Sequence, residues 1–372
     1  MKSYSKNCCP VCLSDEVDKI SLNTSMFRHL DFQLFDSGSN YLARCDHCSA
    51  VFRFGGRTIA ASIDDIYRST EYATDRANVH AVFVDDFPEP VSPFFLQSEI
   101  LLDLLPNTAP KILDIGCFDG SLLGELDKQL EGAYLCGFDV NDNMRNMFPE
   151  GSNFRFFVGD LALVKGQFDL IVMSHSMQYI HNVPYLMNNL QRLLRPTGLV
   201  FVQVPDFSIK PCSILFGDTH YHYTYDILNN IFGCYGFAIC KQDNSWFPRD
   251  LLAIVRSDNS NELVLVKDSS IYDCVDYLEY ATDKLAQLKF SSNVAVLGTT
   301  IEAAFASSVL GSVVKFFVDE NPKKVGTLFN GLSVIHPRKL TGDDTIVLPY
   351  GPTAGYIKEK FEAHYLGEFV CI

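Results

Sequence analysis

Between Ile100 and Arg256 the sequence alternates short apolar runs typical of strands with longer stretches typical of helices. The strand-like runs are KILDIG, AYLCGFD, FRFFVGD, FDLIVMS, GLVFVQV, GFAICKQ and LLAIVRS. Alternation at this spacing places crossover helices on both faces of a mainly parallel sheet, so the pattern predicts an α/β fold. A sheet of this kind binds its ligand at the carboxyl ends of its strands. Functional residues are therefore expected directly after these runs.

The composition bounds the class of protein. The chain has 372 residues, of which 47% are hydrophobic and 20% charged, so it can build two or three ordinary domains. It shows neither a signal peptide nor a run of about eighteen apolar residues, so we expect a soluble, cytoplasmic protein that does not contact membranes. A formal net charge of -15 repels polyanions, so nucleic acid is not an expected partner. We expect a monomer.

Four of the twelve cysteines form two CxxC pairs. They are Cys9, Cys12, Cys45 and Cys48. Each tight turn can place two sulfur atoms about 2.3 Å from one metal ion, so the two pairs together predict a tetrahedral, structural Zn²⁺ site. The alternatives are reduced surface thiols or a redox pair, although the pairs do not lie in a βαβ context. Cys8 could replace Cys9 with a wider loop, and His47 lies inside the second pair.

Three aspartates follow three successive strand-like runs. Asp114, with Gly116 and Gly120, lies in ILDIGCFDGSLLGEL, where the backbone can pass close to a ligand at a helix N-terminus. Asp139 ends the second run, where a carboxylate can accept both ribose hydroxyls of an adenosine. Asp160 ends the third, where a carboxylate and the following backbone N–H can bind an adenine edge. Each aspartate alone could be a helix N-cap, but three in register favour a nucleoside site.

A resemblance to a known family covers residues 98 to 256. The motifs ILDIGCFDGSLL, GFDVN, VGDLA, FDLIVMSHSMQYI and LLRPTGLVFVQVP resemble those of class I S-adenosylmethionine-dependent methyltransferases. The resemblance implies a Rossmann-like core that binds S-adenosylmethionine, with Leu161 and Ser174 added to the aspartates and glycines as cofactor-binding residues. Phe118 departs from the pattern, because the family usually has a glycine at the middle of this loop.

The order of segments along the chain resembles a narrower group, the zinc-containing, three-domain sugar C-methyltransferases of deoxysugar biosynthesis. The segments are the cysteine region ending YLARCDHCSAVFRF, the methyltransferase core, the helix IYDCVDYLEYATDKLAQLKF and a terminal part beginning NVAVLGTTIEAAF. The resemblance implies a zinc-binding domain at residues 1–75, a methyltransferase domain at 76–258 and a smaller Rossmann-like α/β domain at 259–372. It also implies a small-molecule substrate, a nucleotide-linked 4-keto sugar.

The terminal part also forms a small α/β unit without help from the family. VAVLG and FFVDE are its first strand-like runs, and Asp319 lies at a strand end. Gly298 has no GxGxxG companion, so dinucleotide binding has little support there. Lys323, Lys324 or Arg338 could hold the phosphates of a nucleotide sugar.

The segment FGDTHYHYTYDILNNIFGCYGF places His220 and His222 on either side of Tyr221, just before a helical pattern. It follows the fifth strand-like run, so we expect it at the carboxyl edge of the sheet, near the donor methyl group. Methylation beside a ketone needs a base, and histidine suits that task. The matching loop of the sugar C-methyltransferases resembles His-Glu-His, which implies His222 as general base with His220 and Tyr221 beside it. Tyr221 replaces the family's glutamate, and packing beneath the helix is the alternative for both histidines.

Other candidates and alternatives remain. Tyr72 matches a substrate-side tyrosine of the family better than Tyr67 does, and His175 is a further candidate base. A base near the sulfonium serves O-methylation equally well, and an amine scarcely needs one, so O- and N-methyltransferases stay open. The remaining alternatives are a non-catalytic S-adenosylmethionine-binding homologue and an rRNA base methyltransferase, which the acidic charge disfavours.

Overall fold

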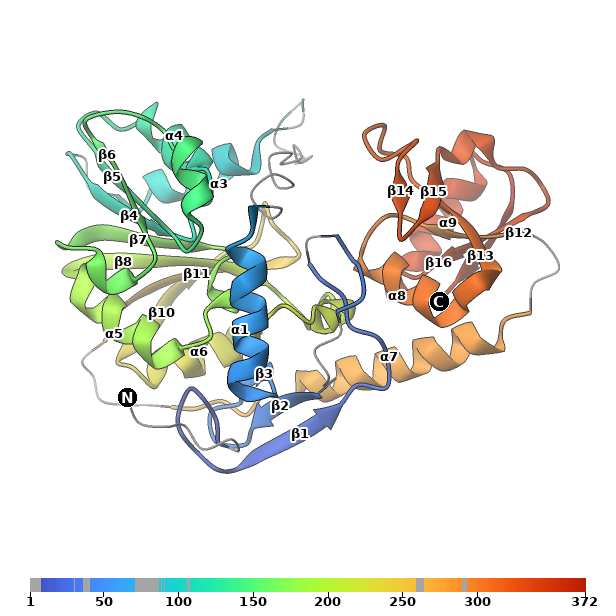
Figure 1. Cartoon of the computed structure of the whole chain (residues 1–372), viewed down its shortest axis with the longest axis horizontal. Coiled ribbons are helices and arrows are strands. Elements are labelled where there is room, and N and C mark those ends of the chain that lie inside the picture. The colour runs from blue at the N-terminus through green and yellow to red at the C-terminus, as the bar shows by residue number, and fades with distance from the viewer. Residues whose placement is uncertain are drawn as a thin grey trace. The chain divides into compact units, whose positions relative to one another are not determined.

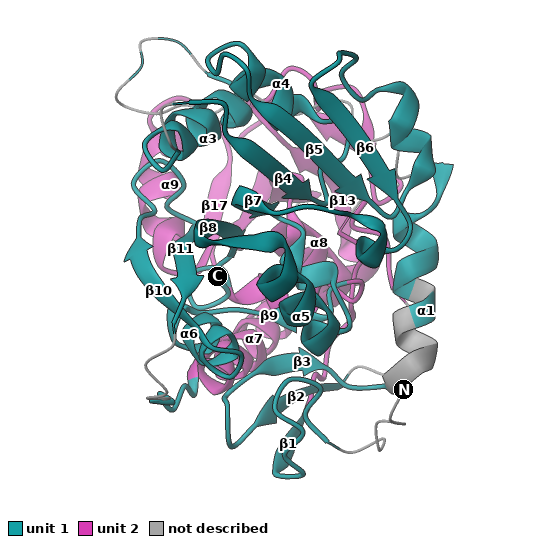
Figure 2. Cartoon of the chain, turned by 90° about the vertical axis from the view of Figure 1, so that its left-hand side faces the viewer, with its two compact units in different colours: residues 1–20, 41–210, 219–269 teal, residues 21–40, 211–218, 270–372 magenta. Residues whose placement is uncertain are grey.

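The computed structural model describes residues 8–29, 31–35, 41–70, 87, 89, 91–105, 108–258, 264–289 and 293–372. Two compact units make up the chain: residues 1–20, 41–210 and 219–269 form unit 1, and residues 21–40, 211–218 and 270–372 form unit 2 (Figure 2). The described residues form three separate sheets with helices, which confirms the predicted α/β class. The domain boundaries drawn from the sequence stay a prediction. Within the described ranges, no helix is long and apolar enough to cross a membrane.

The largest sheet lies in unit 1 and has the strand order β10-β11-β8-β7-β4-β5-β6 (Figure 1). Its strands are β4 (Lys111–Ile115), β5 (Tyr134–Asp139), β6 (Phe154–Val158), β7 (Phe168–Ser174), β8 (Leu194–Pro205), β10 (Phe237–Gln242) and β11 (Asp250–Ser257). The pairs among β4 to β8 are parallel, whereas β11 pairs antiparallel with both β8 and β10. The chain adds β5 and β6 on one side of β4 and β7 and β8 on the other. The order therefore reverses between β4 and β7, where a ligand crevice is expected.

Helices cover both faces of this sheet. They are α3 (Pro93–Leu102), α4 (Ser121–Asp127), α5 (Val183–Leu193) and α6 (Tyr225–Gly233), and α1 (Gly56–Tyr67) is a further helix of unit 1. α3 and α4 lie on one face and α5 and α6 on the other (Figure 1). Apolar residues of α3 and α4, such as Leu101 and Leu122, pack with Ile112 of β4 and Leu170 of β7 in a buried core cluster. This burial fixes the strand ends that carry the polar residues of the site.

Local sequence signals explain where these helices begin. Ser92 caps α3 by accepting a hydrogen bond from the Phe94 N–H, and Pro93 occupies the first helical position. Thr224 caps α6 by accepting from the Ile227 N–H. Such caps satisfy backbone donors that a helix leaves unpaired.

A four-stranded sheet, also mainly in unit 1, joins the cysteine segment to a distant part of the chain. Its strands, in order, are β1 (Val17–Ser21), β2 (Tyr41–Cys45), β3 (Val51–Arg53) and β9 (Tyr221–His222). β3 pairs antiparallel with β9, with Phe52 opposite Tyr221 and Val51 opposite His222. The segment with the two histidines is thus an edge strand of this small sheet.

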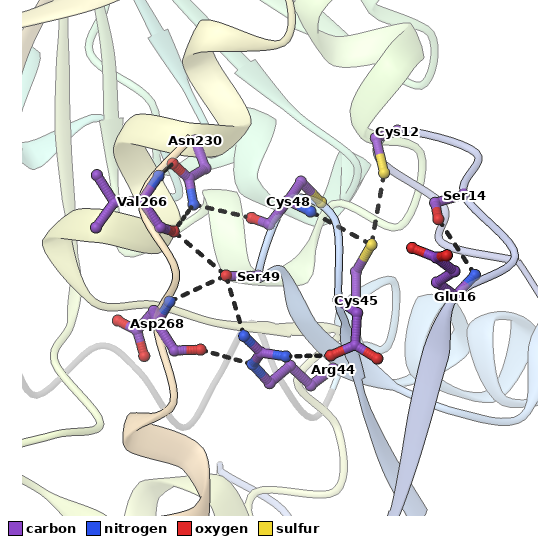
Figure 3. Close-up of polar contacts among 11 residues, drawn as sticks. Cys12, Ser14, Glu16, Arg44, Cys45, Cys48, Ser49, Asn230, Val266 and Asp268 are labelled. Carbon is purple, nitrogen blue, oxygen red and sulfur yellow. Dashed lines mark hydrogen bonds and ion pairs between the residues drawn. The ribbon is translucent and has the colours of Figure 1, made fainter. Parts of the chain in front are cut away.

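A polar network ties the cysteine segment to the stretch before Ser270 (Figure 3). Arg44 is 1% exposed and donates to the Asp268 carbonyl oxygen at 2.6 Å, to Asp46 at 2.6 Å and to Ser49 at 3.3 Å. Ser49 also accepts a hydrogen bond from the Asp268 N–H at 3.0 Å. A buried guanidinium needs such partners, because an unpaired buried charge is costly. The network fixes the cysteine segment within unit 1.

Asn230 of α6 completes the same network (Figure 3). Its side-chain amide donates to the carbonyl oxygens of Cys48, at 3.1 Å, and Val266, at 2.7 Å. Its oxygen accepts from the Val266 N–H at 2.9 Å. Asn230 is fully buried, so one side chain satisfies three backbone groups from two separate segments.

Unit 2 holds a six-stranded sheet with the order β14-β15-β13-β12-β16-β17. Its strands are β12 (Asn293–Leu297), β13 (Val314–Val318), β14 (Leu328–Phe329), β15 (Leu332–Ile335), β16 (Asp344–Leu348) and β17 (Glu368–Cys371), and its helices are α7 (Ser270–Gln287), α8 (Ile301–Leu310) and α9 (Ala354–Glu362). Only the β14–β15 hairpin is antiparallel among the described pairs. The predicted small α/β unit at the end of the chain is confirmed.

Replacing Asn230 by alanine should destabilise unit 1, because three backbone groups lose their partner. We expect the free energy of unfolding to fall by about 1 to 3 kcal/mol, measured by urea denaturation. Asn229→Ala is the matched control, since the neighbouring asparagine of α6 makes no comparable hydrogen bonds among the described residues. Equal effects of the two substitutions would contradict the role given to Asn230.

Candidate functional site

A cavity of about 440 Å³ lies where the strand order of the large sheet reverses. Its walls come from the ends of β4, β5 and β7, from β8 and β11, and from α1 and α3. All of these elements belong to unit 1. Among the predicted cofactor-binding residues, Asp114, Gly116, Asp139 and Ser174 line the cavity. The expected crevice at the carboxyl ends of the strands is present.

The loop after β4 requires unusual backbone conformations. Gly116 has a φ of 81°, and a Cβ atom there would lie 2.4 Å from the Cβ of Ser176. Gly120 has a φ of 76° at the start of α4, and a Cβ there would lie 2.6 Å from Pro149. Phe118 also adopts the left-handed region, with a φ of 51°. That conformation favours glycine, which explains why this position is usually glycine in the family that the sequence resembles.

Asp139 is held in place by backbone donors. Its two carboxylate oxygens accept from the Asn141 N–H at 2.9 Å and from the Phe118 N–H at 3.0 Å. Burial raises the pKa of Asp139, although these N–H groups oppose the rise. Each oxygen keeps a second lone pair, so the carboxylate can still accept hydrogen bonds from a ligand.

Asp114 has a more strongly perturbed carboxyl group. It is 3% exposed, and burial, followed by the charges of Asp139 and Asp119, raises its pKa to about 8. A cationic ligand beside these two neighbouring carboxyl groups would favour their ionised forms, because its charge offsets the repulsion between them.

The cavity lining also holds a chain of polar side chains, of which the sequence pointed to Ser174 and His175 but not to the other three. Gln97 of α3 donates to Ser174 at 2.8 Å and to Gln203 of β8 at 2.6 Å. Gln203 donates to Asp250 of β11 at 2.6 Å, and Asp250 lies 3.1 Å from Nε2 of His175. All five line the cavity. The sequence feature that could have identified one of the missed residues is a polar side chain inside an apolar run, as at Gln203 in GLVFVQV.

The segment of His220, Tyr221 and His222 contacts the loop after β7, at the carboxyl edge of the sheet, but it does not reach the cavity lining. They are 4%, 2% and 5% exposed, and none of them lines the cavity. Tyr221 donates its hydroxyl to the His181 carbonyl oxygen at 2.9 Å. Burial lowers the pKa of both histidines to about 3, with a smaller effect from Arg53. The pairing with β3 buries this segment in the small sheet, and its predicted catalytic role stays a prediction.

Three further candidates are placed away from the cavity or cannot be placed. Asp160 accepts hydrogen bonds from the Tyr185 hydroxyl and the Ala162 N–H, which lower its pKa, and the second of these bonds caps a short 3-10 helix. Leu161 is 5% exposed, and neither residue lines the cavity. Tyr72 lies outside the described residues. The adenine-edge role of Asp160 stays a prediction.

The four predicted metal ligands come together. The sulfur atoms of Cys9, Cys12, Cys45 and Cys48 all lie within 4.8 Å of one another. Cys9 and Cys48 are 3.6 Å apart and Cys12 and Cys45 are 3.5 Å apart. Sulfur atoms at the corners of a tetrahedron around zinc would be about 3.8 Å apart, given Zn–S bonds of about 2.3 Å. The four thiols therefore fit a zinc ion in number, chemistry and spacing.

Comparisons with known proteins point to one domain. Residues 95–242 match the family model described as a methyltransferase domain. The chain is 31% identical to trans-aconitate 2-methyltransferase of Deinococcus radiodurans over 97 residues, which cover 26% of this chain and 38% of that protein. It is 29% identical to malonyl-(acyl-carrier protein) O-methyltransferase of Magnetococcus marinus over 110 residues, or 28% and 41% of the two chains. The chain spans about two fifths of the length of these curated relatives.

Among solved structures, an S-adenosylmethionine-dependent methyltransferase from Mesorhizobium loti is 20% identical, with a TM-score of 0.36. The matched region covers 42% of this chain and 96% of the chain from Mesorhizobium loti. The family match and the strand order define residues 95–242 as a class I, S-adenosylmethionine-dependent methyltransferase domain. The cysteine cluster and the sheet of unit 2 lie outside the matched range.

The carboxyl group of Asp114 should make the ligand-free protein less stable as the pH rises. Its pKa is about 8 in the folded protein against an ordinary value of 3.8, so folding retains a proton between these values. This stabilisation is fully present below about pH 4 and is lost as the pH rises through about 8. Asp114→Asn should flatten the decline in the free energy of unfolding between about pH 5 and about pH 8. Exposed Glu131→Gln is the control, and an unchanged decline in Asp114→Asn would contradict the assignment.

Proposed function

We propose that this protein transfers the methyl group of S-adenosylmethionine to a small molecule. One observation carries the proposal: a single cavity joins the loop after β4 and Asp139 to the polar chain that ends at His175. The first side suits a nucleoside donor and the second suits an acceptor. The cavity opens at the reversal of strand order, where α/β sheets of this kind bind ligands.

The donor side follows from the residues that line it. Asp139 would accept the ribose hydroxyls, and the close backbone approach at Gly116 leaves room that any Cβ atom would fill. Asp139 would add negative charge for a donor that carries a sulfonium and an ammonium group, and binding of that donor would favour ionisation of Asp114. Gly120 shapes the start of α4, and Ser174 lies at the end of β7. We assign the adenine edge to Asp160 and Leu161, on the basis of their position after β6.

We further propose a nucleotide-linked sugar as the acceptor, on the order of the segments along the chain. Methylation of a carbon beside a ketone, with His222 as base and His220, Tyr221 and Tyr72 beside it, is the most specific form of this proposal. Its support is the His-Tyr-His pattern and not the position of these side chains. O- or N-methylation is the alternative. The cavity favours a base from another element, because neither His220 nor His222 lines it.

We propose that the four cysteines hold a structural Zn²⁺. A closed set of four thiolates leaves no position for substrate, so the ion would stabilise the fold of the small sheet and take no part in methyl transfer. The backbone of the second cysteine pair is already tied to α6 through Cys48 and Asn230. The zinc ion and the hydrogen-bond network of Asn230 would then both stabilise the same cysteine segment.

The proposed function is tested by donor binding and by transfer. Asp139→Ala should weaken binding of S-adenosylhomocysteine, measured by calorimetry, by about 2 to 4 kcal/mol, because charge-assisted bonds to the ribose are lost. Asp142→Ala is the control, since Asp142 is exposed and does not line the cavity. Mass spectrometry should detect labelled methyl transfer from the donor to a member of a panel of 4-keto sugar nucleotides and hydroxylated small molecules. Absence of S-adenosylhomocysteine binding by the parent protein would refute the function.

The metal proposal predicts about one zinc per chain in freshly purified, reduced protein, measured by elemental analysis. Cys12→Ser should lower the zinc content and the stability, because metal binding and local folding are coupled. Cys240→Ser is the matched control, since Cys240 is an exposed cysteine outside the cluster. Parent protein free of metal would overturn the assignment.

A further inference from the structure

His175 occupies a strained position at the wall of the cavity. It directly follows β7, and its φ of 49° lies in the left-handed region, which is uncommon for residues other than glycine. Strain of this kind costs on the order of 1 kcal/mol or more and persists where the surroundings hold it. Here the His175 N–H donates to the Gln203 carbonyl oxygen at 2.8 Å, and the imidazole is bound to Asp250. The strained backbone places the imidazole against the cavity.

Asp250 fixes the orientation of this imidazole. One carboxylate oxygen lies 3.1 Å from Nε2 of His175 and accepts from Gln203 at 2.6 Å. Burial opposes ionisation of Asp250, but His175, Gln203 and Lys210 together lower its pKa below the ordinary value. An ionised Asp250 keeps the proton of a neutral imidazole on Nε2, so Nδ1 carries the free lone pair. Within the described residues, Nδ1 has no hydrogen-bond partner.

Gln97 adds an unused acceptor to the same side of the cavity. It is 3% exposed, and both of its hydrogen bonds, to Ser174 and Gln203, use its nitrogen. Its side-chain oxygen is buried and has no partner among the described residues. A buried amide oxygen without a partner is costly, so a ligand donor beside it would be favoured.

The walls around these groups are mainly apolar. Tyr67 and Tyr179 lie with their ring centroids 4.4 Å apart, and both line the cavity with Phe94 and Phe247. The described lining residues include four aspartates but no lysine or arginine. This surface suits an uncharged, partly apolar or aromatic group better than a carboxylate or phosphate.

We propose that His175, oriented by Asp250, is the general base that removes the proton from a hydroxyl group on an uncharged part of the acceptor. The acceptor oxygen gives its proton to Nδ1 and forms a bond to the methyl carbon. The carbon–sulfur bond of the donor breaks, and its electron pair stays on sulfur. The proposal rests on the proposed methyl transfer and takes its alternative, O-methylation, with His175 in place of His222 as the base. Asp250 is a positioning residue, and its charge balances the imidazolium that forms.

The location of this pair can be tested without a known acceptor. Sinefungin carries an amine where the donor carries its methylated sulfur, whereas S-adenosylhomocysteine has no charge there. Asp250→Asn should therefore weaken sinefungin binding on the order of tenfold and leave S-adenosylhomocysteine binding within about twofold, measured by calorimetry. Glu131→Gln is the control for loss of one negative charge away from the cavity, and thermal denaturation checks the fold. An unchanged ratio of the two affinities would overturn the proposal while leaving the proposed function standing.

The base itself is tested with an acceptor found in the labelled-donor screen. His175→Gln should lower the single-turnover rate by roughly 10² to 10⁴ and leave S-adenosylhomocysteine affinity nearly unchanged. The exposed control His364→Gln should transfer methyl near the parent rate. A parent rate in His175→Gln together with a large loss in His222→Gln would reverse the assignment. Absence of S-adenosylhomocysteine binding by the parent protein would instead refute the proposed methyl transfer as a whole.

Discussion

The reversal of strand order between β4 and β7 is the constraint on which the site depends. Because the chain leaves these neighbouring strands in opposite directions across the sheet, their following loops separate and leave a cavity at the carboxyl edge. Gly116 lets the first loop approach Ser176, and His175 takes a left-handed conformation after the second. The residues proposed to bind the methyl donor therefore lie after β4 and β5, and the polar chain to Asp250 lies beside β7 and β8.

The sequence predicted the parts of this arrangement that are local. The runs that became β4, β5 and β7, the glycines of the loop and the positions of Asp114 and Asp139 follow from periodicity and from the rule for strand ends. The four cysteines were also found from spacing, because each CxxC turn is a local feature. In each case a short stretch of chain carries its own signal.

The parts that depend on distant contacts could not be predicted. Gln97, Gln203 and Asp250 come from α3, β8 and β11, and no local pattern says that these elements form one wall. The pairing of Tyr221 with Phe52 joins segments far apart in the chain, and it buries the two histidines that local pattern had assigned to the site. A tyrosine-rich extended segment fits both a buried strand and a loop at an active site, so the sequence pattern alone could not predict that this segment is buried.

A crystal structure of the complex with S-adenosylhomocysteine would test the central claim most directly. The account predicts that the ribose hydroxyls lie within hydrogen-bonding distance of Asp139 and that the sulfur atom faces His175 across the cavity. It also predicts open space between that sulfur and the side-chain oxygen of Gln97, where an acceptor hydroxyl would lie. A ribose held away from Asp139, or a sulfur atom turned toward β6 and away from His175, would contradict the account.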